Sequence, residues 1–145
     1  YGGKYKGFCL EFDTRYDLFT KLRKVIYTKV MPKINISEMI INRNFDQILD
    51  LFCTKSMDWN YEKEWRCLHN NAGTLYAYEA HALKSIYFGP DIDQRSIEII
   101  CLIIDGQNPD VKYWQGYRSE DKFEVYFKNF TYMNYIESKK QGLRK

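Results

Sequence analysis

Hydrophobic and polar residues alternate between Gly7 and Asp13, with phenylalanine and leucine on one side and mainly polar residues on the other. This period of two predicts a strand that has one face against a core. Short runs rich in aromatic and β-branched residues predict further strands. They cover residues 24–30, 61–69, 74–79, 83–88, 111–117 and 123–132.

Apolar residues spaced by three and four positions predict two helices. The first has the stripe Phe45, Ile48, Leu49 and Phe52 and extends from about Ser37 to Lys55. The second follows a cap at Asp91 or Asp93 and has the stripe Ile97, Ile100, Cys101 and Ile104. A shorter helical turn is expected after Asp13. The fold class is therefore α+β, with a mainly antiparallel twisted sheet of about six to seven short strands and two to three helices packed on it.

The length of 145 residues predicts one domain, over residues 1–136, followed by a basic and disordered tail over 137–145. The chain starts without Met and enters a strand within a few residues. We therefore expect that an N-terminal segment of the domain is missing from it.

Composition and charge restrict the function only weakly. Aromatic residues make up 17% of the chain, and the net charge is +3. The last eight residues hold four basic groups and no acid, so the rest of the chain has a net charge of −1. Five Lys and Arg residues between Leu18 and Ser37 lie without an acid among them, which indicates either a solvated face or an anion- and nucleic-acid-binding patch.

The four cysteines are widely spaced and form no Cys-x-x-Cys pair, which favours reduced thiols and a cytoplasmic location. No apolar run approaches the length of a membrane span. Cys9, Cys67 and Cys101 lie in apolar runs, so we expect them to be buried, which disfavours a catalytic cysteine. Cys67 and His69 do not have a zinc spacing, and no metal site is predicted.

Residues 55–66 contain the strongest candidates for catalytic and substrate-binding residues. In a strand over 61–69, Glu62, Glu64 and Arg66 would share one face, and we predict them as catalytic residues. Two neighbouring carboxylates raise each other's pKa and a guanidinium lowers it, so one acid could act as a base while Arg66 keeps the other ionised. Lys55, Trp59 and Tyr61 are the predicted substrate-binding residues, and Trp65 is expected in the core. The alternative is an exposed ladder of ion pairs that contributes little to stability.

Three stretches resemble the bacterial family called domain of unknown function 2971. They are YGGKYKGFCLEFD at 1–13, the block from Lys55 to Arg66 with WNYEKEWR, and LKSIYFGP at 83–90. The resemblance covers about residues 1–90 and suggests that the chain is the C-terminal part of the domain. It implies no known activity, and no catalytic residue follows from it.

Glu62-Lys63-Glu64 is also similar to the Glu/Gln-x-Glu strand of ADP-ribosyltransferases. That resemblance implies that Glu64 stabilises an oxocarbenium-like transition state and Glu62 positions the acceptor. The leading interpretation is an intracellular α+β domain of unknown activity. If it is an enzyme, transfer or hydrolysis at a nucleotide ribose is the first class to test, with nicotinamide dinucleotide as substrate and no evident cofactor. The alternative is a non-catalytic protein- or nucleic-acid-binding module of a defence or regulatory system. The sequence leaves partners, oligomeric state and enzymatic activity open.

Overall fold

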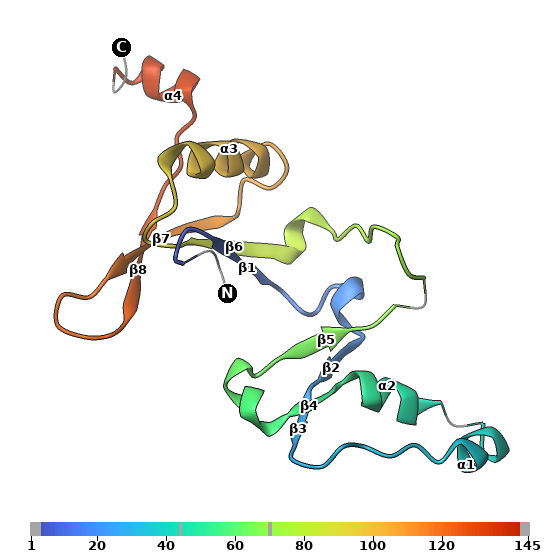
Figure 1. The fold of residues 1–145 in the computed structure, drawn as a ribbon. Helices are drawn as coiled ribbons and strands as arrows, with labels where there is room; N and C mark the ends of the chain where they lie inside the picture. The colour runs from blue at the N-terminus through green and yellow to red at the C-terminus, as the bar shows by residue number, and fades with distance from the viewer. Residues whose placement is uncertain (1–3, 44, 70, 143–145) are drawn as a thin grey trace. The chain divides into compact units, whose positions relative to one another are not determined.

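The computed structural model describes residues 4–43, 45–69 and 71–142, and they form two compact units. The first unit consists of Tyr1–Thr14 and Tyr78–Lys145, and the second of Arg15–Ala77, which lies between those two parts in the sequence (Figure 1). Within the described ranges, no helix combines the length and the apolar character that crossing a lipid bilayer requires.

The first unit is built on a four-stranded sheet with the order β1-β6-β7-β8. Its strands are β1 (Phe8–Phe12), β6 (Leu83–Phe88), β7 (Lys112–Arg118) and β8 (Val125–Phe130). Strand β6 is antiparallel to β1 but parallel to β7, and β7 and β8 form an antiparallel hairpin. The parallel pair is possible because helix α3 (Gln94–Asp105) returns the chain to the start of β7.

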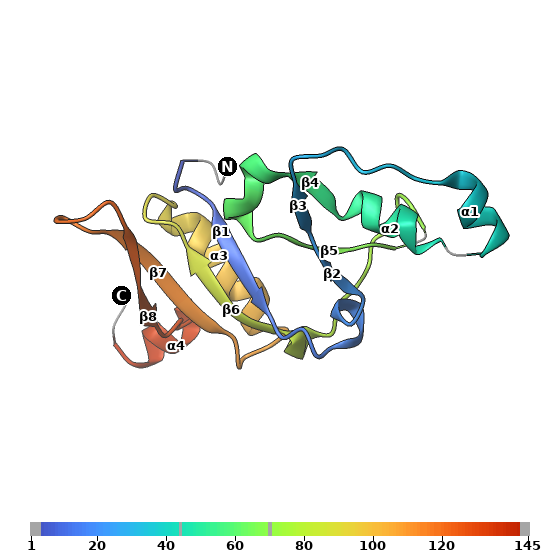
Figure 2. The same cartoon turned by 90° about the horizontal axis from the view of Figure 1, so that it is seen from below.

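Helix α3 covers one face of this sheet (Figure 2). Ile97 and Cys101 on the helix pack in one buried cluster with Ile86 and Phe88 of β6. Ile97 and Cys101 belong to the predicted apolar stripe, and Ile86 and Phe88 belong to the predicted strand, so the apolar side chains of the two elements meet in the core. Removal of this apolar surface from water is the main stabilising contribution to the unit.

The second unit contains two short sheets and small helices. In chain order its elements are η1 (Asp17–Phe19), β2 (Leu22–Lys24), β3 (Ile26–Thr28), α1 (Ile36–Ile41), α2 (Asp46–Phe52), β4 (Thr54–Ser56), η2 (Met57–Glu62) and β5 (Trp65–Cys67). Strands β2 and β5 pair antiparallel, and β3 and β4 pair parallel. Val25 and Cys53 are its buried apolar residues among those described.

The α+β class is confirmed, and so are the first strand, the strand at 83–88, the second helix and the final hairpin. The prediction of one mainly antiparallel sheet with about six to seven strands matches the structure only in part. The described residues form eight strands in three sheets, and two of the five strand pairings are parallel. Alternation along a strand predicts which side chains share a face, but it does not identify the neighbouring strand.

The predicted helix over 37–55 is two helices, α1 and α2. Arg43, between them, has a φ of 49°, a left-handed conformation that an α-helix does not accommodate. The predicted strand over 74–79 is also wrong, because these residues form no regular element. The turn proposed at 70–73 includes position 70, which lies outside the described residues.

The C-terminal segment contains helix α4 (Tyr135–Lys140), which includes the first residues of the tail that was predicted to be disordered. Asn134 caps this helix by accepting a hydrogen bond from the N–H of Glu137. Helix η3 (Ala80–Ala82) leads into β6. The assignment of residues 1–136 to one domain stays a prediction.

Candidate functional site

The chain reverses direction within residues 55–66, which include the first part of the strand predicted over 61–69. Helix η2 ends at Glu62, and Lys63 follows with φ 47° and ψ 44°, in the left-handed region. Strand β5 starts only at Trp65. The prediction that Glu62, Glu64 and Arg66 share a face by strand alternation is therefore wrong.

The same side chains nevertheless meet, because the reversal returns them to Lys55 on strand β4. The ammonium group of Lys55 forms an ion pair with Glu62 and lies 3.4 Å from Oε2 of Glu64. Arg66 donates from Nε and Nη2 to the two oxygens of Glu64, at 2.8 and 3.2 Å. The side chains of Glu62 and Glu64 retain 15% and 31% of their exposure. Acid and base therefore alternate in a partly buried row of four charges, the charge row.

Tyr27 fixes the backbone next to this row. Its hydroxyl accepts a hydrogen bond from the N–H of Glu64, at 2.8 Å. Tyr27 lies opposite Lys55 in the parallel β3–β4 register, so both side chains leave the same face of that sheet. The sequence contained no sign of this role, because Tyr27 is far from Glu64 along the chain.

The contacts of the charge row favour the ionised forms of Glu64, Lys55 and Arg66. Hydrogen bonds from Arg66, and then from Lys55, lower the pKa of Glu64 against the opposing effect of desolvation. Hydrogen bonding to Glu62 is the main cause that raises the pKa of Lys55, and Glu64 likewise raises the pKa of Arg66. A carboxylate with a lowered pKa is a poor proton acceptor near neutral pH, and a protonated lysine is not a nucleophile. This arrangement suits charge stabilisation better than general base catalysis.

The predicted substrate-binding residues lie beside the row. The ammonium group of Lys55 is 4.9 Å from the ring centroid of Trp59, and the rings of Trp59 and Tyr61 are 6.1 Å apart. Tyr61 is 67% exposed. The structure thus brings all six predicted site residues into one neighbourhood, through contacts that differ from the predicted ones.

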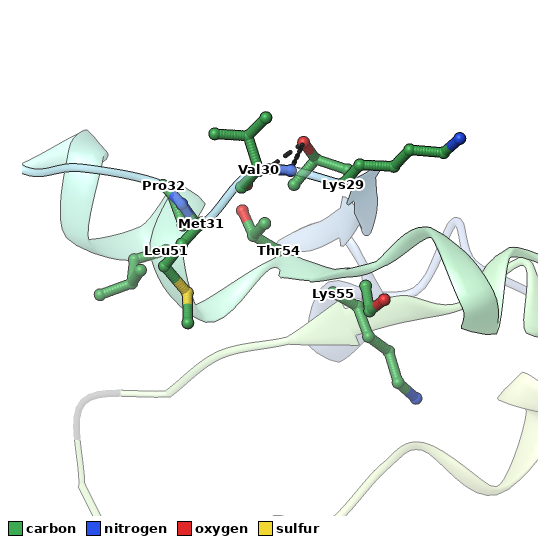
Figure 3. Close-up of a pocket in the computed structure, with 9 residues that line it drawn as sticks. Lys29, Val30, Met31, Pro32, Leu51, Thr54 and Lys55 are labelled. Carbon is green, nitrogen blue, oxygen red and sulfur yellow. Dashed lines mark hydrogen bonds between the residues drawn. The ribbon is translucent and has the colours of Figure 1, made fainter.

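A cavity of about 420 Å³ lies next to strand β4 (Figure 3). Its lining consists of Thr28, Lys29, Val30, Met31, Pro32, Leu51, Thr54, Lys55 and Ser56. Figure 3 shows the side chain of Lys55 leaving the strand on the side away from Thr54. Glu62, Glu64 and Arg66 are not part of the lining, so the two carboxylates do not project into this concavity.

The basic segment between Leu18 and Ser37 is partly neutralised. Arg23 lies 3.0 Å from a carboxylate oxygen of Asp46 and 3.3 Å from one of Asp50, both on α2. Lys24, the next residue, is exposed and lies opposite Trp65 in the β2–β5 pair. The expectation that Trp65 is in the core is wrong, since it is 57% exposed. Arg23 and Lys24 are neighbours on β2, but Arg23 forms ion pairs and Lys24 faces solvent.

The cysteine expectations hold only in part. Cys101 is buried, and burial raises its pKa to about 12. Cys9 is exposed and Cys67 is partly exposed, so both were wrongly expected in the interior. Among the residues that the structure describes, no three His, Cys, Asp or Glu side chains are grouped closely enough to hold a metal ion.

The family model described as "Protein of unknown function (DUF2971)" matches residues 1–67. Over these residues the chain is similar to this family. The match confirms the resemblance seen in the sequence and includes two of its three stretches, the start of the chain and the block from Lys55 to Arg66. The LKSIYFGP stretch lies beyond the DUF2971 match. No curated protein and no solved structure matches the chain significantly.

Proposed function

We propose that the second unit is a non-catalytic module that binds single-stranded nucleic acid. The observation that supports this most directly is the pair of Lys24 and Trp65, which lie opposite each other on β2 and β5 and are both exposed. An exposed ring stacks on a base, and a neighbouring ammonium group attracts the phosphate backbone. Neither contact requires a particular base sequence.

Further side chains of the same unit extend this surface chemistry. Tyr61 is exposed, and so are Lys21 and Lys63. The charge row does not oppose phosphate binding as a whole, because its two carboxylates are balanced by Lys55 and Arg66. In this proposal the charge row is structural and keeps the chain reversal in place, while the aromatic and lysine side chains around it make contact with the ligand.

The test is binding of the full chain to a fluorescent single-stranded oligonucleotide, measured by anisotropy over a range of salt concentrations. We expect Lys24→Gln to weaken binding and to reduce the salt slope by about one phosphate contact. Trp65→Ala should cost about 1–3 kcal/mol of binding free energy with little change in that slope. Arg23→Gln is the matched control, because Asp46 and Asp50 already engage the guanidinium.

Two results would contradict the proposal. One is the absence of binding at low salt. The other is an equal loss of affinity in Lys24→Gln and Arg23→Gln, which would indicate a diffuse charge effect without a defined surface. A protein partner for the exposed aromatic side chains would then be the next hypothesis. The chemistry is compatible with the cytoplasm, where the reduced cysteines would be stable.

A second candidate is transfer or hydrolysis at a nucleotide ribose. It is supported by Glu64, because Arg66 favours the ionised form of its carboxylate, as electrostatic stabilisation of an oxocarbenium-like transition state requires. Lys55, which contacts Glu64, lies over the ring of Trp59. This candidate is weakened because both oxygens of Glu64 already accept hydrogen bonds. This activity and nicotinamide dinucleotide as its substrate remain hypotheses.

A thermal-shift titration with nicotinamide dinucleotide and other nucleotides tests this second candidate, because a ligand that binds the folded state raises its melting temperature. We expect a shift in the wild type that Glu64→Gln removes and that Glu38→Gln, an exposed acid on α1, retains. No shift with any nucleotide in the wild type would exclude the ribose hypothesis. Loss of the shift in both variants would exclude a specific role of Glu64.

A further inference from the structure

A thiol and an imidazole lie in contact at the end of strand β5. Sγ of Cys67 is 3.2 Å from Nε2 of His69, and both side chains are partly exposed. Cys67 is the last residue of β5, and His69 follows two positions later, outside the strand. Arg66 lies between Cys67 and Trp65 and, by strand alternation, leaves β5 on the opposite face. The pair is thus separate from the charge row.

The imidazole is held in place by an aromatic neighbour. Its ring stacks on that of Tyr76, with centroids 3.9 Å apart and an angle of 24° between the planes. The hydroxyl of Tyr76 donates to the carbonyl oxygen of Asn71, at 3.1 Å, which positions the tyrosine in turn. A histidine whose ring plane is fixed beside a thiol is the arrangement that a base needs in order to remove the thiol proton.

The thiol itself has two acceptors within reach. Its sulfur lies 3.0 Å from the carbonyl oxygen of Leu18 and 3.2 Å from Nε2 of His69. Rotation about the Cβ–Sγ bond turns the single proton from the first acceptor to the second when Nε2 is unprotonated. Transfer of the thiol proton to the imidazole therefore starts with this rotation.

We propose that Cys67 is a site of thiol–disulfide exchange with low-molecular-weight disulfides and that His69 is its base. Nε2 takes the proton of the Cys67 thiol, and Sγ attacks one sulfur of the disulfide. A new S–S bond forms to Cys67 while the original S–S bond breaks. The departing thiolate receives the proton from His69 and leaves as a thiol, so Cys67 is oxidised to a mixed disulfide and one sulfur of the reagent is reduced. This proposal does not depend on nucleic-acid binding.

The chain contains its own controls for this reaction. Cys9 is exposed, and its sulfur lies 3.9 Å from the carbonyl oxygen of Leu10. Among the residues that the structure describes, no imidazole contacts this sulfur. Cys9 therefore reports the rate of an ordinary accessible thiol. Cys53 and Cys101 are buried, so their reaction reports unfolding.

The experiment treats the full reduced chain with bis(hydroxyethyl) disulfide at neutral pH, a neutral probe that avoids charge effects. Mass spectrometry of proteolytic peptides follows each cysteine with time. We expect Cys67 to form the mixed disulfide at least about tenfold faster than Cys9. This factor is a lower limit, because general base catalysis usually increases a rate by more than that. His69→Gln should reduce this ratio to about one, whereas Tyr76→Phe, which keeps the stacked ring, should preserve it.

A Cys67 that reacts no faster than Cys9 in the wild type would overturn the proposal. So would an unchanged ratio in His69→Gln when Cys53 and Cys101 remain unreactive and the variant is therefore folded. If His69→Gln unfolds the chain, His69→Asn replaces it as the test, and the wild-type ratio of Cys67 to Cys9 still decides whether the site is activated.

Discussion

The ammonium nitrogen of Lys55 lies 3.4 Å from Oε2 of Glu64, although helix η2 and a left-handed residue separate the two in the sequence. The approach depends on the chain reversal at Lys63 and on the hydrogen bond from the N–H of Glu64 to Tyr27. Lys55 on β4 and Glu64, just before β5, thus face each other across a turn. The consequence is a charge row in which hydrogen bonds from Arg66 and Lys55 lower the pKa of Glu64 and make it a weaker base.

The charge row should give the second unit a measurable pH dependence. Because the pKa of Glu64 is lowered in the folded state, its contribution is fully present above the ordinary carboxyl pKa of 4.5 and is lost as the pH falls through the lower folded value. Lys55 behaves in the opposite sense. Its contribution is present below the ordinary value of 10.5 and is lost as the pH rises through the higher folded value.

The measurement is urea denaturation at a series of pH values from about 3 to about 8, a range that covers the titration of the carboxyl group. We expect Glu64→Gln to be less stable than the wild type at neutral pH, with the difference narrowing as the solution is acidified. Glu38→Gln, on the exposed surface of α1, should follow the wild-type profile. A difference between Glu64→Gln and the wild type that does not change with pH would show that the carboxylate charge is not what stabilises the reversal.

Packing in the first unit predicts that the same substitution, isoleucine to valine, changes the unfolding free energy more at a buried position than at an exposed one. Ile86 is 0% exposed beneath helix α3, whereas Ile99 on the outer side of that helix is 49% exposed. Ile86→Val should cost about 0.5–1.5 kcal/mol in unfolding free energy, because it leaves a cavity. Ile99→Val should change it by less than about 0.5 kcal/mol. Equal losses in chemical denaturation would contradict the packing of α3 on this face.

Gly89 follows β6 at a point where the backbone approaches very closely. A Cβ atom there would overlap the carbonyl group of Tyr5 and lie 2.9 Å from the carbonyl oxygen of Gly7. Both are backbone atoms, so Gly89→Ala should destabilise the first unit by about 1–3 kcal/mol. At Gly106 a Cβ would meet atoms no nearer than 3.7 Å, and Gly106→Ala should be close to neutral. Thermal melts of the two variants distinguish the cases.

Asn108 is a buried polar residue at a position that requires a hydrogen-bond donor. Its amide nitrogen donates to the carbonyl oxygens of Ala80 and Leu83, at 2.7 and 3.0 Å. Asn108→Asp replaces this donor with an acceptor and should cost about 1–3 kcal/mol or more. Asn134→Asp is the matched control, because that side chain acts as the acceptor that caps α4 and an aspartate does so equally well. Similar melting temperatures for both variants would contradict the hydrogen bonds assigned to Asn108.

Much of the first unit could be predicted because its elements are regular. The stripe that contains Ile97 and Cys101 and the alternation from Gly7 to Asp13, which forms β1, each follow a fixed period, which a single sequence displays. The second unit resisted the same reasoning because its strands have only three residues each. A period cannot be established over so few positions, and the conformation of Lys63 is decided by contacts with other segments.

The sequence by itself determined which chemical groups are available in residues 55–66, and it determined the α+β class through the periods of its longer elements. The tertiary structure alone decided that Lys55 and Arg66 form ion pairs with the two acids, and that Trp65 and Lys24 are both exposed on paired strands. It also decided that Cys67 contacts His69, whose ring stacks on that of Tyr76. The physical reason is that charge pairing and solvent exposure depend on distances in space between residues far apart in the chain. Local preferences along the sequence do not encode those distances.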